Sequence, residues 1–269
     1  SSLARHLRKA GREVVVCDVR PEAVAVLTER GATAAATPAE VAALAEVISV
    51  VVLDDAQARE VVAGPGGILE TAAPGTVVAV HSTISVETGF DLGRLAADTG
   101  VHLVDAPVSG GPSGARNGTL VVMAGGDDAA VERCRLAFEP WSSLVMHVGP
   151  VGAGTKMKVA RNLLHYVAFT AVGEAQRLAE VLGVDLLALG EVVRASDALT
   201  GGAGSIMLRD ATGPLAADDG LRDVFTHVRD LGEKDLDLAL SLAAEHGVDL
   251  PLAALARRDL AAALGVPPP

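Results

Sequence analysis

The first 149 residues alternate between short apolar runs and segments in which apolar positions recur at the spacing of an amphipathic helix. The apolar runs predict β-strands at Glu13–Cys17, Val47–Leu53, Thr76–Val80, Val101–Val108, Leu120–Ala124 and Leu144–Val148. The segments between them predict helices at Pro21–Arg30, Pro38–Glu46, Ala56–Val62, Ser85–Thr99 and Asp128–Phe138. Strands that alternate with helices are typical of an α/β fold with a doubly wound parallel sheet. Within that sheet, we expect the run Val47–Leu53 to be buried on both faces.

The pattern changes at the segment 149–154, whose sequence GPVGAG predicts a hinge. After it we find only helical periodicity, at Gly154–Leu182, Leu186–Ala195, Leu221–Glu245 and Leu252–Leu264. We therefore expect two domains, an α/β domain over residues 1–149 and an all-α domain over residues 150–269. Because aromatic residues make up only 2 % of the chain, the core must be built from Ala, Val and Leu.

The chain begins without methionine, and its first residues, SSLARHLRKAG, have the pattern of a helix interior. In a doubly wound sheet, such a helix normally follows a Gly-rich loop that holds the phosphates of a dinucleotide. We therefore expect the domain to lack its first, central strand and that loop. On this expectation, the 269-residue chain alone is poorly soluble or binds a dinucleotide weakly.

Charge and cysteine content narrow the classes of function. The net charge of −12 disfavours binding to the phosphate backbone of nucleic acids, although a local basic patch could hold one small anion. Cys17 and Cys134 lie in apolar sequence, so we expect two buried thiols and neither a disulfide nor a metal site. Free thiols favour the cytoplasm. We expect no signal peptide and no membrane span, because the longest apolar run is far shorter than about 20 residues.

Three strand ends carry candidate cofactor ligands, because a parallel sheet binds ligands at the carboxyl ends of its strands. Asp18 follows the first apolar run, where a carboxylate can accept hydrogen bonds from an adenosine ribose and repel a 2′-phosphate. A turn or a helix cap would explain Asp18 equally well. Leu53 ends the second run. Ser82 and Thr83 follow the third, where their hydroxyls could bond a nicotinamide ribose or cap the helix that begins near Ser85.

The segment DAPVSGGPSGARNGTL, residues 105–120, is the most unusual of the chain. It predicts a strand that ends at Ser109, Gly110 and Gly111. Consecutive glycines let the backbone approach a ligand closely and direct N–H groups at an anion, for which a substrate carboxylate is the natural candidate. A Gly-rich surface turn is the alternative interpretation.

A second motif, GAGTKMKVARNLLHYV, contains Lys158 near the start of a predicted helix. Asn162 and His165 follow four and seven residues later, on the same helix face. A partly desolvated lysine has a lowered pKa and can exchange protons near neutral pH, while the amide could fix its position. The alternative is a solvated basic face formed by Lys156, Lys158 and Arg161, and spacing alone favours it.

The third motif, GEKDLDLAL, places Lys234 and Asp235 at the start of an amphipathic segment. The lysine could reach a cofactor or a substrate. A salt-bridged pair on the surface is the commoner explanation for such neighbours.

In this order, the three motifs resemble the 3-hydroxyisobutyrate dehydrogenase family, the β-hydroxyacid dehydrogenases. DAPVSGG with a following GT, the pattern G-x-G-x-x-x-K-x-x-x-N and KDL are all specific, and the resemblance covers essentially the whole chain. It implies an NAD(P)-dependent oxidoreductase with a Rossmann-type domain, like that of 6-phosphogluconate dehydrogenase, that oxidises a small 3-hydroxy acid. By analogy it also implies a helical substrate and dimerisation domain, and hence a homodimer or homotetramer.

The resemblance further implies a role for each candidate residue. Lys158 is the catalytic acid/base, and Asn162 orients the substrate. The backbone of Ser109–Gly111 holds the substrate carboxylate. Thr83 meets the cofactor, and Lys234 lines the cleft.

Other positions qualify the resemblance. Asp18 implies a preference for NAD over NADP. Because the positively charged Arg20 lies nearby in the sequence, NADP stays possible. Three residues differ from the family pattern: Arg161 replaces a frequent Asn, Asp54 replaces a usual Pro, and His165 replaces a commonly apolar residue. Because of these differences, the resemblance does not identify the substrate. The alternatives are a reductase of semialdehydes or imines on the same fold and a non-catalytic dinucleotide-binding or interaction protein. The lysine of the second motif argues against the imine reductases, which generally lack it.

Overall fold

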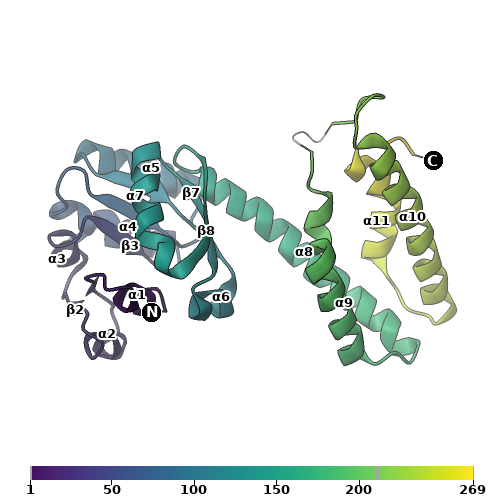
Figure 1. The fold of residues 1–269 in the computed structure, drawn as a ribbon, viewed down its shortest axis with the longest axis horizontal. Coiled ribbons are helices and arrows are strands. Elements are labelled where there is room, and N and C mark those ends of the chain that lie inside the picture. Colours follow the sequence, from purple (N-terminus) through teal and green to yellow (C-terminus); the bar gives the residue numbers. More distant parts are fainter. Residues whose placement is uncertain (1, 210–212, 269) are drawn as a thin grey trace. The chain divides into compact units, whose positions relative to one another are not determined.

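The computed structural model describes residues 2–209 and 213–268 and divides the chain into two compact units, Ser1–Asn162 and Leu163–Pro269. The first unit is an α/β fold, and the described residues of the second form helices joined by loops (Figure 1). The predicted fold class, a Rossmann-type sheet domain followed by helices, is therefore confirmed.

The first unit is built on a six-stranded sheet in the order β3-β4-β5-β7-β6, with β8 also paired to β7. These strands are β3 (Val47–Val50), β4 (Val77–Val80), β5 (His102–Asp105), β6 (Val108–Ser109), β7 (Leu120–Gly125) and β8 (Ser142–Gly149). The first three run parallel, so that Val50, Val80 and Asp105 lie side by side at their carboxyl ends. β8 is parallel to β7, but β7 is antiparallel to both β5 and β6.

The expectation of a wholly parallel sheet is therefore wrong for one part of it. The predicted strand Val101–Val108 is split into β5 and β6, with Pro107 between them, because proline has no N–H for a strand ladder. After β6 the chain turns through the seven-residue helix α6 (Gly111–Asn117) directly into β7. A connection this short returns the chain antiparallel, since a parallel neighbour requires a longer crossover.

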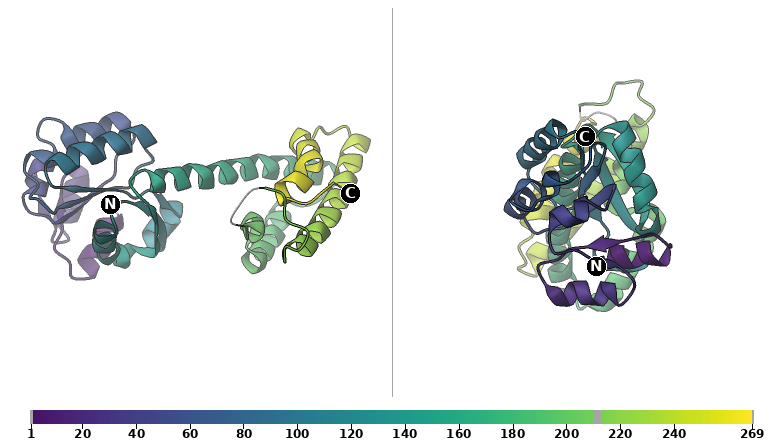
Figure 2. Two further views of the ribbon diagram at one scale, coloured as in Figure 1. Left: turned by 90° about the horizontal axis from the view of Figure 1, so that it is seen from above. Right: turned by 90° about the vertical axis from the view of Figure 1, so that its left-hand side faces the viewer.

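Both faces of the central strands are covered by helices (Figure 2). Val78 and Val80 of β4 belong to one apolar cluster, formed with α4 (Asp55–Ala63), α5 (Val86–Asp98) and η1 (Ile68–Glu70). Val77 and Ala79 belong to a second cluster, formed with α7 (Asp128–Phe138) and η2 (Glu139–Trp141). Alternate residues of β4 thus point into opposite cores, which explains why this strand is apolar throughout.

β3 does not follow this rule, and the prediction that Val47–Leu53 is buried on both faces is wrong. Ile48 and Val50 are buried, whereas Ser49 is exposed and Val51 is 63 % exposed. β3 lies at one end of the strand order. One of its faces packs against the cluster of α4 and α5, whereas the other face is partly covered at Val47, by the cluster of α7, and is open beyond it.

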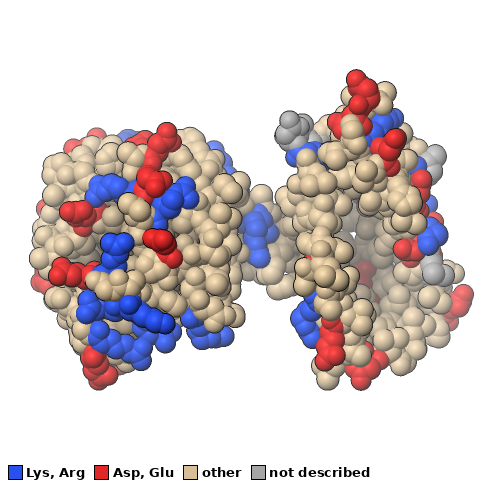
Figure 3. Space-filling view, in the orientation of Figure 1, with Lys and Arg blue, Asp and Glu red and all other residues tan. Residues whose placement is uncertain are grey.

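The first residues form a smaller substructure. β1 (Val15–Val16) pairs in parallel with β2 (Thr33–Ala34) as a separate two-stranded sheet, beside α1 (Ser2–Lys9) and α2 (Pro21–Thr28). Cys17 follows the last paired residue of β1 and is exposed, so its predicted burial is wrong, while Cys134 is buried as predicted. α3 (Pro38–Ala42), which Thr37 caps, leads to β3 and is shorter than the predicted Pro38–Glu46. Lys and Arg side chains gather on this part of the otherwise acidic protein (Figure 3).

The described residues of the second unit form helices joined by loops, and none of them forms a strand. α8 (Ala153–Val181) begins in the first unit, and the second adds α9 (Leu186–Thr200), η3 (Gly202–Ile206), α10 (Arg222–Glu245) and α11 (Pro251–Leu264). α10 and α11 pack around Phe225 and Leu264. Over residues 2–209 and 213–268, none of the helices combines the length and the apolar character that crossing a membrane requires.

Candidate active site

Lys158 lies in the second turn of α8, and it is buried, whereas Lys156 and Arg161 on the same helix are exposed. Its Nζ donates a hydrogen bond to the carbonyl oxygen of Val108 at 2.6 Å. Burial lowers the pKa of the Lys158 ammonium below its ordinary value, and the positive charge of Arg161 lowers it further. Lys158 is therefore not part of a solvated basic face, although spacing alone favoured that interpretation.

A buried carboxylate holds the start of the same helix. Asp105, the last residue of β5, is fully buried and accepts hydrogen bonds from the backbone N–H groups of Gly152 at 2.7 Å and Thr155 at 2.6 Å. These N–H groups have no partner within the helix, so the carboxylate caps α8 from another part of the chain. Burial raises the pKa of Asp105, and the two N–H groups act in the opposite direction.

Glycines make this close approach possible. Gly152 has φ +89°, a backbone conformation that other residues rarely adopt. A Cβ atom on Gly154 would collide with the carbonyl oxygens of Asp105 and Met123, and one on Gly125 would collide with the Asp105 carboxylate. The G-x-G of the lysine motif is therefore needed for packing the helix start onto the ends of β5 and β7.

The predicted carboxylate-binding segment lies directly beside Lys158. Ser109 is the last residue of β6, opposite Val121 of β7, and Gly110 and Gly111 follow with φ of +123° and +58°. Both glycines are exposed. Since Lys158 donates to the carbonyl of the residue before Ser109, the structure brings the candidate acid/base and the candidate anion-binding backbone together.

The ends of β3 and β4 carry the residues expected to meet a cofactor. The Ser82 hydroxyl donates to the carbonyl of Val52 at 2.6 Å and accepts from its N–H group at 2.8 Å, so it ties the two strand ends together. Thr83 is exposed, and Leu53 is 87 % exposed. Neither Ser82 nor Thr83 caps α5, because Ser85 does so by accepting from the N–H of Thr88.

Asp18 and Arg20 form a pair next to the end of β1. The Asp18 carboxylate accepts from the Arg20 guanidinium at 3.2 Å and from its backbone N–H at 3.0 Å. These bonds lower the pKa of Asp18. The Asp18 carboxylate is the candidate acceptor for the ribose hydroxyls. It is also paired with Arg20, a cation that could bind a phosphate.

Three other candidate residues lie in the helical part of the chain. The side chain of Asn162, at the end of the first unit, accepts from Arg161 at 3.3 Å. The His165 ring packs against Phe169 with ring centroids 4.2 Å apart. Lys234 on α10 belongs to the second unit and pairs with Asp235 at 2.9 Å, so its role at a cofactor stays a prediction.

Sequence reasoning missed Asp105 as an individual residue and His81 altogether. His81 is buried after β4, with Nδ1 2.8 Å from the Ala106 carbonyl and Nε2 3.0 Å from the Ser49 hydroxyl. A carbonyl only accepts, so Nδ1 carries the proton of a neutral ring. Burial lowers the pKa of His81 to about 4. A polar residue at the end of an apolar strand was the available signal in both cases.

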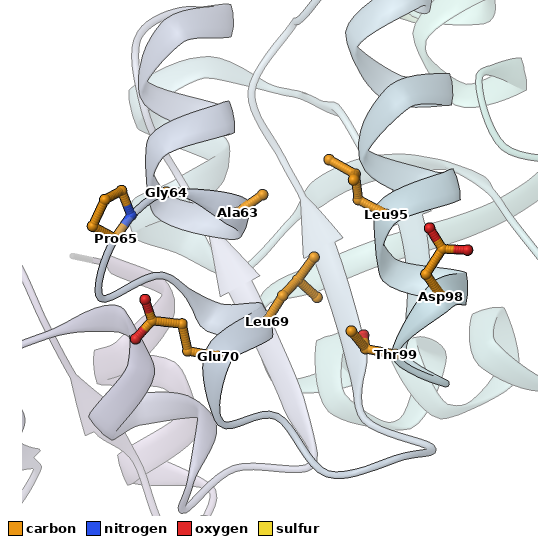
Figure 4. A pocket seen from close by; sticks show the side chains of 8 residues that line it. All are labelled: Ala63, Gly64, Pro65, Leu69, Glu70, Leu95, Asp98 and Thr99. Carbon is orange, nitrogen blue, oxygen red and sulfur yellow. The ribbon is translucent and has the colours of Figure 1, made fainter.

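A hollow on the surface of the first unit lies elsewhere. It is between the last turns of α4 and α5 and is lined by Ala63, Gly64, Pro65, Leu69, Glu70, Leu95, Asp98 and Thr99 (Figure 4). Because these helices begin at the carboxyl ends of β3 and β4, their last turns lie at the opposite edge of the sheet. This hollow contains none of the candidate site residues.

Two family models match most of the chain. Residues 1–149 match the NAD binding domain of 6-phosphogluconate dehydrogenase, and residues 152–265 match the NAD-binding region of NADP-dependent 3-hydroxyisobutyrate dehydrogenase. The chain is 53 % identical over 256 residues to an uncharacterised oxidoreductase of Mycobacterium tuberculosis, covering 95 % of this chain and 86 % of that protein.

It is also 35 % identical over 259 residues to the 3-hydroxyisobutyrate dehydrogenase of Pseudomonas aeruginosa, covering 95 % of this chain and 85 % of the relative. Among solved structures, a Mycobacterium avium protein described as an oxidoreductase superposes with a TM-score of 0.94 at 50 % identity. That match covers 99 % of this chain and 95 % of the other.

Proposed function

The chain belongs to the 3-hydroxyisobutyrate dehydrogenase family of β-hydroxyacid dehydrogenases, and we propose that it transfers a hydride between a nicotinamide dinucleotide and a small 3-hydroxy acid, with Lys158 as the acid/base. The observation that carries this proposal is the buried Lys158 ammonium, held against the Val108 carbonyl beside a Gly-rich segment. Its pKa is lowered by burial, as proton exchange near neutral pH requires.

In the oxidation direction, the carbon-bound hydrogen of the substrate leaves as a hydride and the hydroxyl hydrogen leaves as a proton. The chemistry that a bound nicotinamide dinucleotide supplies is acceptance of the hydride. We assign the proton to Nζ of Lys158, which must be a neutral amine to accept it. Burial and Arg161 both favour the neutral amine. In the reverse direction, the Lys158 ammonium returns the proton to the carbonyl oxygen as it becomes a hydroxyl.

The proposed substrate class follows from what lies next to Lys158. The exposed backbone of Gly110 and Gly111 offers N–H groups without side chains that would block a carboxylate. In a 3-hydroxy acid, one carbon separates the hydroxyl-bearing carbon from the carboxylate carbon, a short separation that suits a base held at Val108, the residue before the anion-binding segment. Asn162, one turn beyond Lys158, is assigned to orient the substrate.

The residues at the strand ends fit a dinucleotide. Thr83 and Leu53 are exposed, and the Asp18 carboxylate is kept ionised by the hydrogen bonds that lower its pKa. We assign Asp18 to the adenosine ribose, and Leu53 and Thr83 to the nicotinamide half, with Ser82 fixing the backbone beside them. Lys234 is assigned to the same cofactor, and NAD is the preferred form with NADP possible.

We also propose that the protein assembles as a homodimer or homotetramer through its helical unit. On α9, Leu187 is 82 % exposed and Leu199 is 89 % exposed, and Val192 is exposed as well. Several large apolar side chains exposed along one helix favour burial against another chain. Light scattering of the purified protein tests this proposal, and a monomer at micromolar concentration would contradict it.

Steady-state assays test the proposed activity. The full-length protein is incubated with NAD or NADP and a series of 2-hydroxy, 3-hydroxy and 4-hydroxy acids, and reduction of the nicotinamide is followed by absorbance. We expect turnover of 3-hydroxy acids. Activity only in the reductive direction, with semialdehydes or imines, would support the alternative reductase, and cofactor binding without turnover would support a non-catalytic protein.

A further inference from the structure

Asp105 is a buried carboxylate for which hydride transfer has no direct need. Its Oδ1 accepts from the N–H of Gly152 and its Oδ2 from the N–H of Thr155. Thr155 is itself buried and lies three residues before Lys158. The Asp105 carboxylate therefore holds the first turn of α8 by hydrogen bonds, and Lys158 extends from the next turn.

The other end of segment 105–108, in β6, contacts Lys158 directly. Val108 lies three residues after Asp105, and its carbonyl accepts from Lys158 Nζ at 2.6 Å. Segment 105–108 thus accepts three hydrogen bonds from segment 152–158, two from backbone N–H groups at the helix start and one from the lysine side chain. With these bonds in place, neither the start of the helix nor the ammonium can shift independently of the Gly-rich loop that follows.

The contact between Asp105 and the start of α8 is tightly packed. A Cβ on Gly154 or on Gly125 would collide with Asp105 or its neighbours. A side chain longer than Asp at position 105 would therefore push α8 away from the sheet, and a shorter one would leave N–H groups of the helix buried without partners.

We propose that Asp105 is the positioning residue for the catalytic lysine: its carboxylate sets the axial position of α8, and thereby places Lys158 Nζ at the Val108 carbonyl. The inference rests on the proposed role of Lys158 as acid/base. An ordinary helix cap has a different role, because its removal lowers stability without changing the chemistry of a particular side chain. Removal of the Asp105 carboxylate should change the chemistry of Lys158 as well.

The chain contains a matched control for that distinction. Glu174 of α8 is buried and accepts from the N–H groups of Leu252 at 2.8 Å and Ala253 at 2.9 Å, so it caps α11 as Asp105 caps α8. Both are buried carboxylates that each bond two backbone N–H groups at a helix start. Only the helix that Asp105 caps carries Lys158.

The test compares Asp105→Asn with Glu174→Gln in the full-length protein. Each change is isosteric and turns one accepting oxygen into an NH₂ group that faces an N–H donor. We measure the melting temperature, the dissociation constant for NAD, and kcat against pH in the oxidation direction. Asp105→Ser, smaller than Asp and still able to accept one hydrogen bond, is carried in parallel in case the amide variant does not fold.

We expect both amide variants to melt at lower temperature and to bind NAD with nearly unchanged affinity. Asp105→Asn should lower kcat about 10- to 100-fold, since small misplacement of a reacting group has effects of this size. A less tightly held Lys158 becomes better hydrated, so its pKa should rise and the increase of kcat with pH should move to higher pH. Arg161, the charged group that acts on Lys158, is unchanged in both variants.

The inference is overturned if Asp105→Asn and Asp105→Ser keep the wild-type kcat and pH profile, or if Glu174→Gln changes them equally. Lys158→Ala, assayed beside them, separates this inference from the proposed function. An active Lys158→Ala enzyme would refute the acid/base assignment itself. An inactive one, together with a fully active Asp105→Asn enzyme, would refute only the positioning role.

Discussion

Nζ of Lys158 donates to the carbonyl oxygen of Val108 at 2.6 Å, although the two residues are 50 positions apart in the sequence. The bond joins the first turns of α8 to the last strand before the exposed Gly110 and Gly111. It uses one of the three donors of the ammonium, and among residues 2–209 and 213–268 Nζ makes no other hydrogen bond, so that two donors can serve a ligand. The proposed proton acceptor is therefore held at Val108, the residue directly before the proposed anion-binding segment.

Gly154→Ala should disrupt this arrangement. The added Cβ would collide with the carbonyl oxygens of Asp105 and Met123, which are backbone atoms that cannot turn aside. We expect a loss of about 1–3 kcal/mol in the free energy of unfolding, measured by urea denaturation. Gly173→Ala in the same helix is the control. Its Cβ would meet only the flexible end of Arg177, so it should stabilise the protein by up to about 1 kcal/mol. Equal stabilities of the two variants would contradict the packing argument.

His81 should make stability depend on pH. Burial lowers its pKa from 6.5 to about 4, so between these values the unfolded chain binds a proton that the folded protein does not. The free energy of unfolding should therefore fall as the pH falls from about 6.5 to about 4, by about 3 kcal/mol in total from this group. Denaturant titrations of wild type and His81→Gln at several pH values isolate its share. Parallel pH curves for the two proteins would show that His81 does not titrate in this way.

Asp18 should set the choice of cofactor. Its hydrogen bonds to Arg20 lower its pKa, so it is a carboxylate at neutral pH and repels a 2′-phosphate. We expect kcat/KM to be higher with NAD than with NADP in the full-length protein. Asp18→Ala should shrink that preference and also free Arg20 for the phosphate. Arg20→Ala is the matching variant and should widen the preference. A wild-type enzyme that prefers NADP would refute the assignment.

The sequence predicts the elements of this protein better than it predicts their contacts. β4 is apolar at every position and packs both of its faces, as the pattern indicates. The run that begins at Val47 packs one face well through Ile48 and Val50, whereas its other face is covered only at Val47 and leaves Ser49 and Val51 exposed, because its place at the end of the strand order is a tertiary property. α6 was missed because its residues, GPSGARN, are typical of a turn.

For the candidate site too, the sequence predicts the residues better than it predicts their contacts. Lys158 could be located from its motif, but spacing alone favoured a solvated cation, and only the packing of α8 on the sheet shows that it is buried. Asp105 was visible as the end of an apolar strand, yet its contact with Gly152 and Thr155 joins segments about 50 residues apart. No local pattern specifies which helix start a buried carboxylate will cap.

The role of Lys158 in proton transfer is decided by the activity of Lys158→Ala. The full-length variant is assayed for kcat in the oxidation of a 3-hydroxy acid and for NAD affinity by fluorescence titration. Lys158→Arg accompanies it, because a guanidinium cannot release its proton near neutral pH, and Lys156→Ala serves as the control for an exposed cation on the same helix. The account predicts a loss of about 10²–10⁴ in kcat for Lys158→Ala with nearly unchanged NAD affinity, a similar loss for Lys158→Arg and a far smaller one for Lys156→Ala. If Lys158→Ala kept more than about a tenth of the wild-type kcat, the assignment of Lys158 as the acid/base would be contradicted.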